Sequence, residues 1–416
     1  MRDIKEIARI IDLKGGKLFL VGGAVRDKLL EVENHDEDYC VTGISFDEFK
    51  KLFPEAIVRG KDFPVFDIDG KEFAIARKER KIGIGHNSFD VETDKKITIE
   101  EDLERRDITI NAIAQNVLTG EIIDPFNGQK DIENRIIRAV GSHFKEDPLR
   151  VYRVARFASK FDFKVDQKTI KMMTLLRDEL SSLSAERVYI ELKKALLSDY
   201  PSNFFKILND ARVLDIHFKE IYDLIGAEQP AVYHPEGDAF NHTMIVLDKV
   251  TDQTMNFNDD RKLEIRFAAL VHDLGKGTTP KEEYLHHIGH EKRGAELVKN
   301  IESRLKLPGR LVKCGKTACL EHMRGGMFDN MTAAKKVSFI EKNYSSILGL
   351  DGLQIIVNAD NTSEDKSRNQ FEKIGYEVMN SINGTEIMNK YKLSEGIEIK
   401  NRLHEHRVEF LKSKGF

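Results

Sequence analysis

One short segment constrains the fold of this chain more than any other: residues 20–27 read Leu-Val-Gly-Gly-Ala-Val-Arg-Asp. The run from Lys17 to Val21 has the length and the apolar character of a β-strand. Gly22 and Gly23 permit a tight turn in which the backbone can approach phosphate oxygens. A helix that begins near Ala24 would direct its N-terminal amides at an anion. The segment therefore predicts a phosphate site at the end of a strand.

Two carboxylates follow this turn within a few residues. The next strand, expected around Glu37 to Val41, carries Asp36 and Asp38 at positions i and i+2, and in an extended chain their side chains share one face. Such a pair suits one or two magnesium ions. With the guanidinium of Arg26, the parts that hold a nucleoside triphosphate and its metal ions lie within about one β-α-β unit. A surface D-x-D and an ordinary Gly-Gly turn are the alternatives for the separate parts, but their combination favours phosphoryl transfer.

A second constellation reads Arg-Arg-Asp-Ile-Thr-Ile-Asn-Ala over residues 105–112. Arg106 offers paired donors to a phosphate, and Asp107 and Asn111 offer polar groups to ribose hydroxyls. A charged strand edge beside a buried strand is the structural alternative. The segment is therefore a second candidate for nucleotide binding.

The run Glu-Asp-Pro-Leu-Arg at 146–150 is expected to begin a helix, with Asp147 as the N-cap and Pro148 at the first helical position. Arg150 lies three residues on, on the same side of that helix. The carboxylate could accept from the exocyclic amine of a base while the guanidinium donates to ring acceptors. Cytosine and adenine carry that amine, whereas uracil and guanine carry a carbonyl. The pair therefore predicts selection of C and A, and a purely structural helix cap is the alternative.

A third constellation is made of histidine, since seven of the thirteen histidines lie between residues 234 and 322. An apolar run from Phe267 ends in His272 and Asp273, and Gly275 is expected to end its helix. The flanking histidines are His242 upstream and His286, His287 and His290 downstream. Imidazoles together with a carboxylate suit a transition metal better than magnesium. A single structural His-Asp pair is the alternative.

Taken in order, these stretches resemble the bacterial tRNA nucleotidyltransferases, the CCA-adding enzymes of the class shared with bacterial poly(A) polymerases. The chain is most similar to the multifunctional CCA proteins that carry an HD domain. The matching stretches are residues 20–27, 36–38, 60–66, 76–81, 105–112, 124–128, 146–153, 186–187 and 272–277. The resemblance implies template-independent addition of C, C and A to the 3′ end of tRNA from CTP and ATP. The 3′-hydroxyl would attack the α-phosphorus in line and release pyrophosphate.

The resemblance also implies a role for each matched residue. Asp36 and Asp38 would coordinate catalytic Mg²⁺, and a polar loop from Arg77 to Asp90 would serve the switch from C to A addition. Asp107 and Asn111 would face the ribose. The nucleotide-binding set is Gly22, Gly23, Arg26, Arg106, Asp107, Asn111, Asp147, Arg150, Arg153 and Arg156. Asp147 and Arg150 would serve as a protein template for the base. Glu186 and Arg187 are expected to have a structural role, in which they cap or brace the helix that orients this pair.

For the histidine-rich region, the resemblance implies an HD phosphohydrolase that cleaves 2′,3′-cyclic phosphodiesters or phosphomonoesters at RNA ends. His242, His272 and Asp273 would bind a transition metal such as Ni²⁺ or Mn²⁺. The sequence departs from the family at His322-Met323, where His-Asp is usual. Asp351 and Asp360 are both open as the further metal ligand from a later helix. An HD fold that only binds or braces is the alternative to a working hydrolase.

The expected fold class is α+β: a small nucleotidyltransferase α/β head, then a mostly α-helical neck, an HD domain and a tail. The pattern is helical from about residue 145 onward, and a chain of 416 residues without Trp and with 9 Pro fits two to four domains. The predicted boundaries are 1–140 for the head, 141–225 for the neck with its templating helix, 226–350 for the HD domain and 351–416 for the helical tail.

The net charge of −4 does not indicate nucleic-acid binding, so the tRNA surface must be a local basic stripe. The candidates are Arg150, Arg153, Arg156 and Lys160 on one helix, and Lys392, Lys400, Arg402, Arg407, Lys412 and Lys414 near the C-terminus. Three cysteines without C-x-x-C spacing fit a reducing cytoplasm. No signal peptide or membrane span is expected, and monomer and homodimer are both open.

Three alternative functions share these features. A poly(A) polymerase would have the same first half, but the HD segment argues against it. An HD metal-dependent phosphohydrolase with an RNA-binding head is the other enzyme. A non-catalytic RNA-binding protein with a decayed site is the third alternative, and the intact carboxylates argue against it.

Overall fold

The computed structural model describes residues 3–33, 37–60, 64–81, 89–92, 94–230, 235–361, 370–394 and 396–416. The chain divides into two compact units, one formed by residues 1–187 with 206–213 and the other by 188–205 with 214–416. The predicted domain boundaries at residues 140, 225 and 350 are finer than this division and stay predictions. No helix formed by the described residues combines the length and the hydrophobicity needed to span a membrane.

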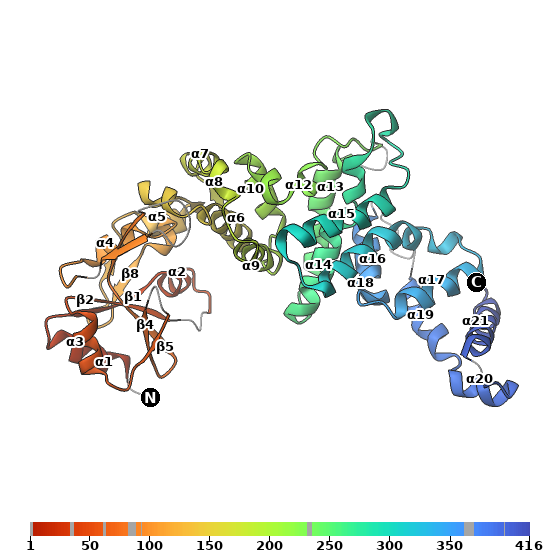
Figure 1. The fold of residues 1–416 in the computed structure, drawn as a ribbon, viewed down its shortest axis with the longest axis horizontal. Helices are drawn as coiled ribbons and strands as arrows, with labels where there is room; N and C mark the ends of the chain where they lie inside the picture. Colours follow the sequence, from red (N-terminus) through yellow and green to blue (C-terminus); the bar gives the residue numbers. More distant parts are fainter. Residues whose placement is uncertain are drawn as a thin grey trace. The chain divides into compact units, whose positions relative to one another are not determined.

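The first unit contains a mixed sheet of seven strands within the described residues, in the order β3-β4-β5-β2-β1-β8-β9 (Figure 1). These strands are β1 (Lys17–Val21), β2 (Asp38–Thr42), β3 (Ile57–Arg59), β4 (Val65–Ile68), β5 (Lys71–Ile75), β8 (Ala114–Asn116) and β9 (Ile122–Ile123). β2 and β5 run parallel, and the other neighbours in this sheet are antiparallel.

Both faces of the sheet are covered, which explains the apolar run of β1. Alternate residues of a strand point to opposite faces. Leu18 packs in the cluster that contains Ile7 and Phe49, whereas Phe19 packs in the cluster that contains Leu103. The helices of this part are α1 (Ile4–Asp12), α2 (Gly23–Leu29), α3 (Phe46–Leu52), α4 (Ile99–Glu104) and α5 (Gly128–Glu133).

The structure corrects the prediction of a β-α-β unit around the glycine turn. β1 and β2 are antiparallel neighbours, and Val21 at the end of β1 pairs with Asp38 at the start of β2. α2 between them has only seven residues, about 10 Å of helix. The chain therefore re-enters the sheet at the end where it left it, instead of crossing over to the opposite end as a parallel pair requires.

The loop predicted from Arg77 to Asp90 lies partly outside the described residues. Its two ends form the strands β6 (Lys78–Lys81) and β7 (Phe89–Glu92), which pair antiparallel with each other. These strands were not predicted, because the segment lacks the apolar alternation that marks a half-buried strand. Antiparallel pairing needs only the backbone hydrogen bonds.

The remainder of the first unit is mostly helical. α6 begins at Arg150 with Leu149 as its N-cap, so the helix starts two residues later than the predicted start at Pro148. Asp147 still bonds locally, since its Oδ1 accepts from the backbone amide of Leu149 at 3.0 Å. The elements are β10 (Ile136–Ile137), α6 (Arg150–Phe161), β11 (Lys164–Val165), α7 (Gln167–Leu175) and α8 (Arg177–Leu180); α9 (Ala185–Leu196) and α10 (Ser202–Asp210) have residues in both units.

The second unit is helical in the part of the chain that the structure describes (Figure 1). Its buried cluster joins residues of α13, α14, α16, α17 and α18, including Val246, Ile265, Cys314 and Phe339. The helices are α11 (Leu214–His217), α12 (Lys219–Tyr222), α13 (Ala239–Gln253), α14 (Asp259–Val271), α15 (His290–Leu305), α16 (Gly309–Gly326), α17 (Ala333–Tyr344), α18 (Gly349–Asp360), α19 (Phe371–Asn380), α20 (Gly384–Tyr391) and α21 (Gly396–Ser413).

One member of the predicted C-terminal basic stripe is not on a solvated surface. Arg407 on α21 donates to Glu341 on α17 at 2.8 Å, and its side chain is only 12% exposed. His404 contacts the same carboxylate at 2.8 Å. Arg407 therefore holds α21 against α17, because a carboxylate on the neighbouring helix faces it.

Candidate functional site

The antiparallel register of β1 places the glycine turn beside Asp38. Val21 pairs with Asp38 on one side and with Ala114 on the other. The amide of Gly22 donates to the carbonyl of Ile113 at 3.1 Å, which ties the turn to the segment before β8. Gly22 has a φ of +68°, and a Cβ there would collide with the guanidinium of Arg106. Only glycine can adopt this positive φ and leave room for the Arg106 side chain without strain.

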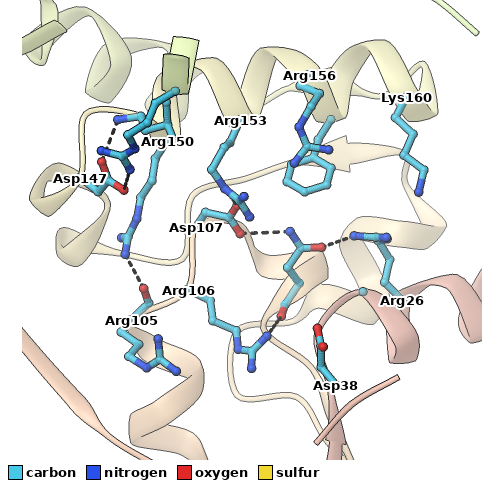
Figure 2. A pocket seen from close by; sticks show the side chains of 15 residues that line it. Arg26, Asp38, Arg105, Arg106, Asp107, Asp147, Arg150, Arg153, Arg156 and Lys160 are labelled. Carbon is cyan, nitrogen blue, oxygen red and sulfur yellow. Dashed lines mark hydrogen bonds and ion pairs between the residues drawn. The ribbon is translucent and has the colours of Figure 1, made fainter. Parts of the chain in front are cut away.

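A pocket of about 530 Å³ opens next to this turn, and Figure 2 shows the side chains that line it. Arg153, Arg156 and Lys160 project from α6 toward Arg26 and Asp107, and Asp38 lies on the opposite wall. Eight of the lining residues are cationic and three are aspartates. The lining is Gly23, Arg26, Asp38, Arg105, Arg106, Asp107, Asn111, Asp147, Leu149, Arg150, Arg153, Arg156, Phe157, Lys160 and Arg187.

A chain of hydrogen bonds positions two of the guanidiniums. Asp107 Oδ2 accepts from Arg153 Nε at 2.7 Å, and Asp107 Oδ1 accepts from Asn111 Nδ2 at 3.0 Å. The oxygen of the Asn111 amide in turn accepts from Arg26. Burial alone would raise the pKa of Asp107, but Arg153 and the Asn111 amide lower it well below its usual range. The carboxylate is therefore charged at any pH at which the protein works.

Arg26 is buried and packed on aromatic rings. Its guanidinium carbon lies 4.8 Å from the ring centre of Phe161 and 5.5 Å from that of Phe157, and its Nε donates to Asp27 at 2.7 Å. Burial lowers the pKa of Arg26, and Asp27 opposes that shift. A cation over the face of an aromatic ring is attracted by the charge distribution of that ring. Arg26 is therefore held in place before any ligand arrives.

Asp147 and Arg150 both line the pocket, but they do not bond to each other in this structure. Asp147 Oδ2 accepts from Arg187 at 3.0 Å. Arg150 donates to the backbone carbonyls of His143 at 2.6 Å and Arg105 at 2.5 Å. Arg187, for which the sequence predicted a structural role, thus contacts one member of the predicted templating pair directly.

The structure brings most of the predicted nucleotide site to one pocket. Of the predicted residues, Asp36 lies outside the described residues, and Gly22 adjoins the pocket through Gly23 and Arg106. Arg105 and Phe157 also line the pocket although they were not predicted to do so, and Lys160 lines it although it was predicted for tRNA binding alone. The regular spacing of Arg150, Arg153 and Arg156 along α6 was the signal that could have placed Lys160 and Phe157 on the same wall.

The second unit holds a buried cluster of histidines and carboxylates. His242 comes from α13, His272 and Asp273 follow α14, and Asp360 is the last residue of α18. The ligand atoms of these four residues all lie within 4.8 Å of one another. His242 Nε2 is 2.8 Å from Asp360 Oδ1, and His272 Nε2 is 3.2 Å from Asp273 Oδ2.

The sequence left Asp351 and Asp360 open as the further metal ligand, and the structure places Asp360 in the cluster. Asp351 lies at the start of α18 and forms an ion pair with Arg261 at 2.7 Å. Asp360 lies at the other end of the same helix, beside His242 and His272. The two carboxylates lie at opposite ends of α18, and only the C-terminal end of this helix reaches the cluster.

The cluster has the properties of a metal site. The Nδ1 of His242 contacts Glu236 at 2.6 Å, and that of His272 contacts the carbonyl of Ala269 at 2.7 Å, so each Nε2 faces inward. Among the described residues, neither oxygen of Asp273 nor the Nε2 of His272 makes a hydrogen bond of ordinary geometry, although all are buried. Burial alone would lower the pKa of His272, but Asp273 and Asp360 raise it to about 10. Asp273 is 1% exposed with Lys276 Nζ at 2.7 Å from Oδ2, and the Asp360 side chain is 23% exposed. Imidazole nitrogens together with carboxylate oxygens fit a transition metal.

Gly275 has a different role from the predicted helix end. It lies in a 3₁₀ turn (Leu274–Thr278), and α14 has already ended at Val271. A Cβ on Gly275 would overlap the carbonyl oxygen of His290. The glycine therefore allows the backbone after Asp273 to approach the start of α15.

Three segments of this chain match known families. Residues 18–138 match the family described as the Poly A polymerase head domain, and residues 162–224 match the probable RNA and SrmB-binding site of polymerase A. Residues 239–358 match the HD domain.

Known structures agree with this fold. The chain aligns with a CCA-adding enzyme in complex with ATP at a TM-score of 0.69 and 20% identity, over 99% of this chain and 90% of that one. It aligns with the Thermotoga maritima CCA-adding enzyme complexed with tRNA at a TM-score of 0.67 and 20% identity, over 99% and 92%. At this identity the likeness concerns the fold.

Curated proteins are more similar in sequence. The Multifunctional CCA protein of Pseudoalteromonas atlantica is 47% identical over 300 residues, 70% of this chain and 72% of that protein. That of Psychromonas ingrahamii is 45% identical over 311 residues, 73% of each chain. The chain therefore belongs to the family of multifunctional CCA proteins, in which a poly(A) polymerase-type nucleotidyltransferase head precedes an HD domain.

Proposed function

We propose that this protein adds C, C and A to the 3′ end of tRNA from CTP and ATP without a nucleic-acid template. The observation that carries the proposal is the cationic pocket beside Asp38 and the glycine turn, in a chain whose relatives are multifunctional CCA proteins. Eight cationic side chains around three carboxylates suit a ligand with several negative charges, as a triphosphate has. The 3′-hydroxyl of tRNA attacks the α-phosphorus in line, and the bond to pyrophosphate breaks.

Different residues of the pocket bind different parts of the nucleotide. Mg²⁺ bound by Asp36 and Asp38 would lower the pKa of the attacking hydroxyl and neutralise the leaving pyrophosphate. Arg26 and Arg106, next to the glycine turn, hold the triphosphate. Asp107 and Asn111 face the ribose, and their bonds to Arg153 and Arg26 also keep those guanidiniums in the pocket.

Base selection is assigned to Asp147 and Arg150. A carboxylate acceptor and a guanidinium donor match cytosine and adenine and oppose uracil and guanine. Arg187 fixes Asp147 at 3.0 Å, so the carboxylate is already oriented. Arg150 is bonded to two backbone carbonyls, and a base must compete with one of them to be read. tRNA is bound through its backbone charge and A-form shape, so its affinity falls with salt.

A second activity is assigned to the HD domain on the evidence of its buried cluster. A divalent transition metal such as Ni²⁺ or Mn²⁺ would be held by His242, His272, Asp273 and Asp360, and it would supply a bound hydroxide at neutral pH. The substrate class is a phosphoester at an RNA 3′ end, either a 2′,3′-cyclic phosphodiester or a phosphomonoester. The three buried thiols and the RNA substrates both fit a cytoplasmic location.

One experiment tests the transferase. A tRNA that ends at its discriminator base is incubated with magnesium and each NTP alone or in pairs, and the products are resolved at single-nucleotide resolution. We expect C, C and A and then a stop, with UTP and GTP ignored. A long A tail would instead identify a poly(A) polymerase.

Paired variants assign the two activities to their sites. The double variant Asp36→Ala/Asp38→Ala should abolish nucleotide addition and retain hydrolysis of 2′,3′-cyclic nucleotides. His272→Ala should have the opposite effect. If the Asp36→Ala/Asp38→Ala protein still extends tRNA, the head is not the transferase site. Hydrolysis by the His272→Ala protein would refute the assignment to the HD cluster.

A further inference from the structure

A buried glutamine beside the histidine cluster has an amide group that is only partly used. Gln229 is 5% exposed, and its Oε1 accepts from Lys276 Nζ at 2.6 Å. Its Nε2 is buried as well, and this atom has no hydrogen-bond partner among the described residues. A buried donor without a partner costs free energy, so this amide points to an acceptor that binds from outside the chain.

The lysine connects this amide to the cluster. Lys276 Nζ is 2.7 Å from Asp273 Oδ2, and the Lys276 side chain is 10% exposed. An ammonium group has three donors and no acceptor, so the amide oxygen of Gln229 must face it. The amide nitrogen shares a carbon with that oxygen, so it lies close to Lys276 and can donate to a group bound beside the cluster.

The backbone around Gln229 is held in place. Its amide donates to the carbonyl of Gly237 at 3.2 Å. The carbonyl of the preceding residue, Glu228, is 2.9 Å from the Nε2 of His287, and the Nδ1 of the same ring is 3.0 Å from Thr279 Oγ1. His287, which the sequence placed among the flanking histidines, therefore supports the segment that carries Gln229.

The ligand that these donors fit is an anion. The Lys276 ammonium and the Gln229 Nε2 offer only hydrogens to an incoming group. A phosphate group carries negative charge on several acceptor oxygens, and hydrogen bonds to such oxygens are stronger than bonds between neutral groups. The donors and the cluster therefore suit the two parts of one ligand, a phosphate whose oxygens also reach the metal.

The amide is also more informative than a carboxylate would be at this position. A glutamate would accept from Lys276 equally well and would add the attraction of opposite charges. It would, however, donate nothing and would repel a phosphate. Glutamine forgoes the stronger ion pair and retains a donor, which is the choice expected where an anion binds.

We propose that Gln229 binds the phosphoester substrate of the HD domain, with its Nε2 as donor to a non-bridging phosphate oxygen. Lys276 adds a positive charge next to the same phosphate. This inference rests on the proposed function of the HD domain, because the phosphate must lie at the metal site formed by His242, His272, Asp273 and Asp360.

Anion binding at the metal tests the proposal without reference to turnover. The full-length Asp36→Ala/Asp38→Ala protein serves as the background, so that the head carboxylates bind no metal. It is loaded with Co²⁺, whose visible absorption responds to the ligands of the ion, and titrated with inorganic phosphate. We expect Gln229→Met to lower the affinity for phosphate about tenfold or more, because one hydrogen bond to a charged group is lost. The Co²⁺ content should stay the same.

Another buried glutamine of the same unit provides a matched control. Gln354 on α18 is 7% exposed, donates to Asn358 at 2.9 Å and accepts from the amide of Glu372 at 3.2 Å. Gln354→Met should keep the phosphate affinity of the background protein. Its melting temperature should fall at least as far as that of Gln229→Met, because both of its hydrogen bonds are lost.

A double-mutant cycle separates direct binding from an effect through Lys276. If Gln229 donates to the phosphate itself, Gln229→Met should lower the phosphate affinity further in the Lys276→Met background. Equal affinities of Lys276→Met and the double variant would overturn direct binding and leave Gln229 as a support of the lysine.

The failures of this inference and of the proposed function are distinguishable. Equal phosphate affinities of the background protein and Gln229→Met overturn the inference and leave the hydrolase site. Loss of Co²⁺ from Gln229→Met also overturns it, since the residue would then support the metal and not the substrate. A protein that binds no Co²⁺, or that neither responds to phosphate nor hydrolyses 2′,3′-cyclic nucleotides, overturns the proposed function of the HD domain together with this inference.

Discussion

Replacement of Asp107 by asparagine tests whether the pocket depends on its internal hydrogen bonds. Asp107 accepts from Arg153 Nε at 2.7 Å, from Asn111 at 3.0 Å and from the amide of Ile108 at 2.9 Å. An asparagine retains one acceptor oxygen and turns its amide group toward a donor. The variant therefore loses one charge-assisted hydrogen bond, which is worth about 1.5–3 kcal/mol when buried. The side chain of Arg153 is 35% exposed and can regain water, so we expect a loss of about 1–2 kcal/mol.

The same change should weaken catalysis because Arg153 and, through Asn111, Arg26 lose their fixed positions. Each 1.4 kcal/mol lost in binding the transition state lowers kcat/KM about tenfold. We therefore expect Asp107→Asn to lower kcat/KM for CTP and ATP by about tenfold. Single-nucleotide addition to tRNA measures this value, and urea unfolding followed by circular dichroism measures stability.

Asp131 provides a matched control in the same unit. It is buried, it bonds to Arg138 Nε at 3.0 Å, and the Arg138 side chain is 37% exposed, but neither residue lines the pocket. Asp131→Asn should therefore cost similar stability and leave kcat/KM within about twofold. If both variants lower kcat/KM equally, or if Asp107→Asn leaves it unchanged, the positioning role of Asp107 is wrong.

The effect of Asp107→Asn should not depend on pH in the working range. The pKa of Asp107 is lowered in the folded protein, so its contribution is present above the unfolded pKa and is lost only as pH falls through the lower folded pKa. Between about pH 6 and pH 9 the stability difference from the wild type should be constant.

Three further predictions concern other parts of the molecule. Asp147→Ala should reduce the preference of the enzyme for CTP over UTP by about tenfold or more, because one base-reading hydrogen bond is lost. The ratio of kcat/KM for the two nucleotides measures this preference, and an unchanged ratio would exclude Asp147 as a template. Gly275→Ala should destabilise the second unit by about 1–3 kcal/mol and weaken metal binding, because the new Cβ overlaps the His290 carbonyl. The control Gly309→Ala should be nearly neutral, because a Cβ there meets open space. Equal melting temperatures for the two variants would contradict this packing argument. Burial lowers the pKa of His217 from 6.5 to about 4, so the unfolded chain takes up a proton that the folded chain does not, and this residue should remove about 2 kcal/mol of stability as the pH falls from about 8 to about 5. Urea unfolding at the two pH values should show a smaller loss in His217→Gln, and an equal loss would refute the assignment.

The local features of the head could be predicted from the sequence because they depend on neighbouring residues. The strand Lys17–Val21, the glycine turn and the helix after it follow from an apolar run, two glycines and helical spacing within about ten residues. The family resemblance and the HD match were also readable, because their motifs keep their order along the chain.

The pairing between distant segments required the tertiary structure. Arg26 and Asn111 are 85 positions apart, and Asp147 and Arg187 are 40 apart, yet each pair bonds in one pocket. No periodicity connects such positions, since the contact depends on which strands pair and where α6 packs. The antiparallel pairing of Val21 with Asp38 is a similar case, because the short α2 decides the direction in which the chain returns.

The HD cluster shows most clearly the difference between what the sequence predicts and what only the tertiary structure decides. From the sequence, Asp351 and Asp360 were equal candidates, and His322 was noted only because Met323 follows it. The structure separates them by geometry: the far end of α18 reaches His242, and α16 turns His322 inward and Met323 outward. The sequence by itself determined which chemical groups are available and roughly in which domain. The tertiary structure decided which of them meet, because convergence depends on helix ends and helix faces that are set by packing between distant segments.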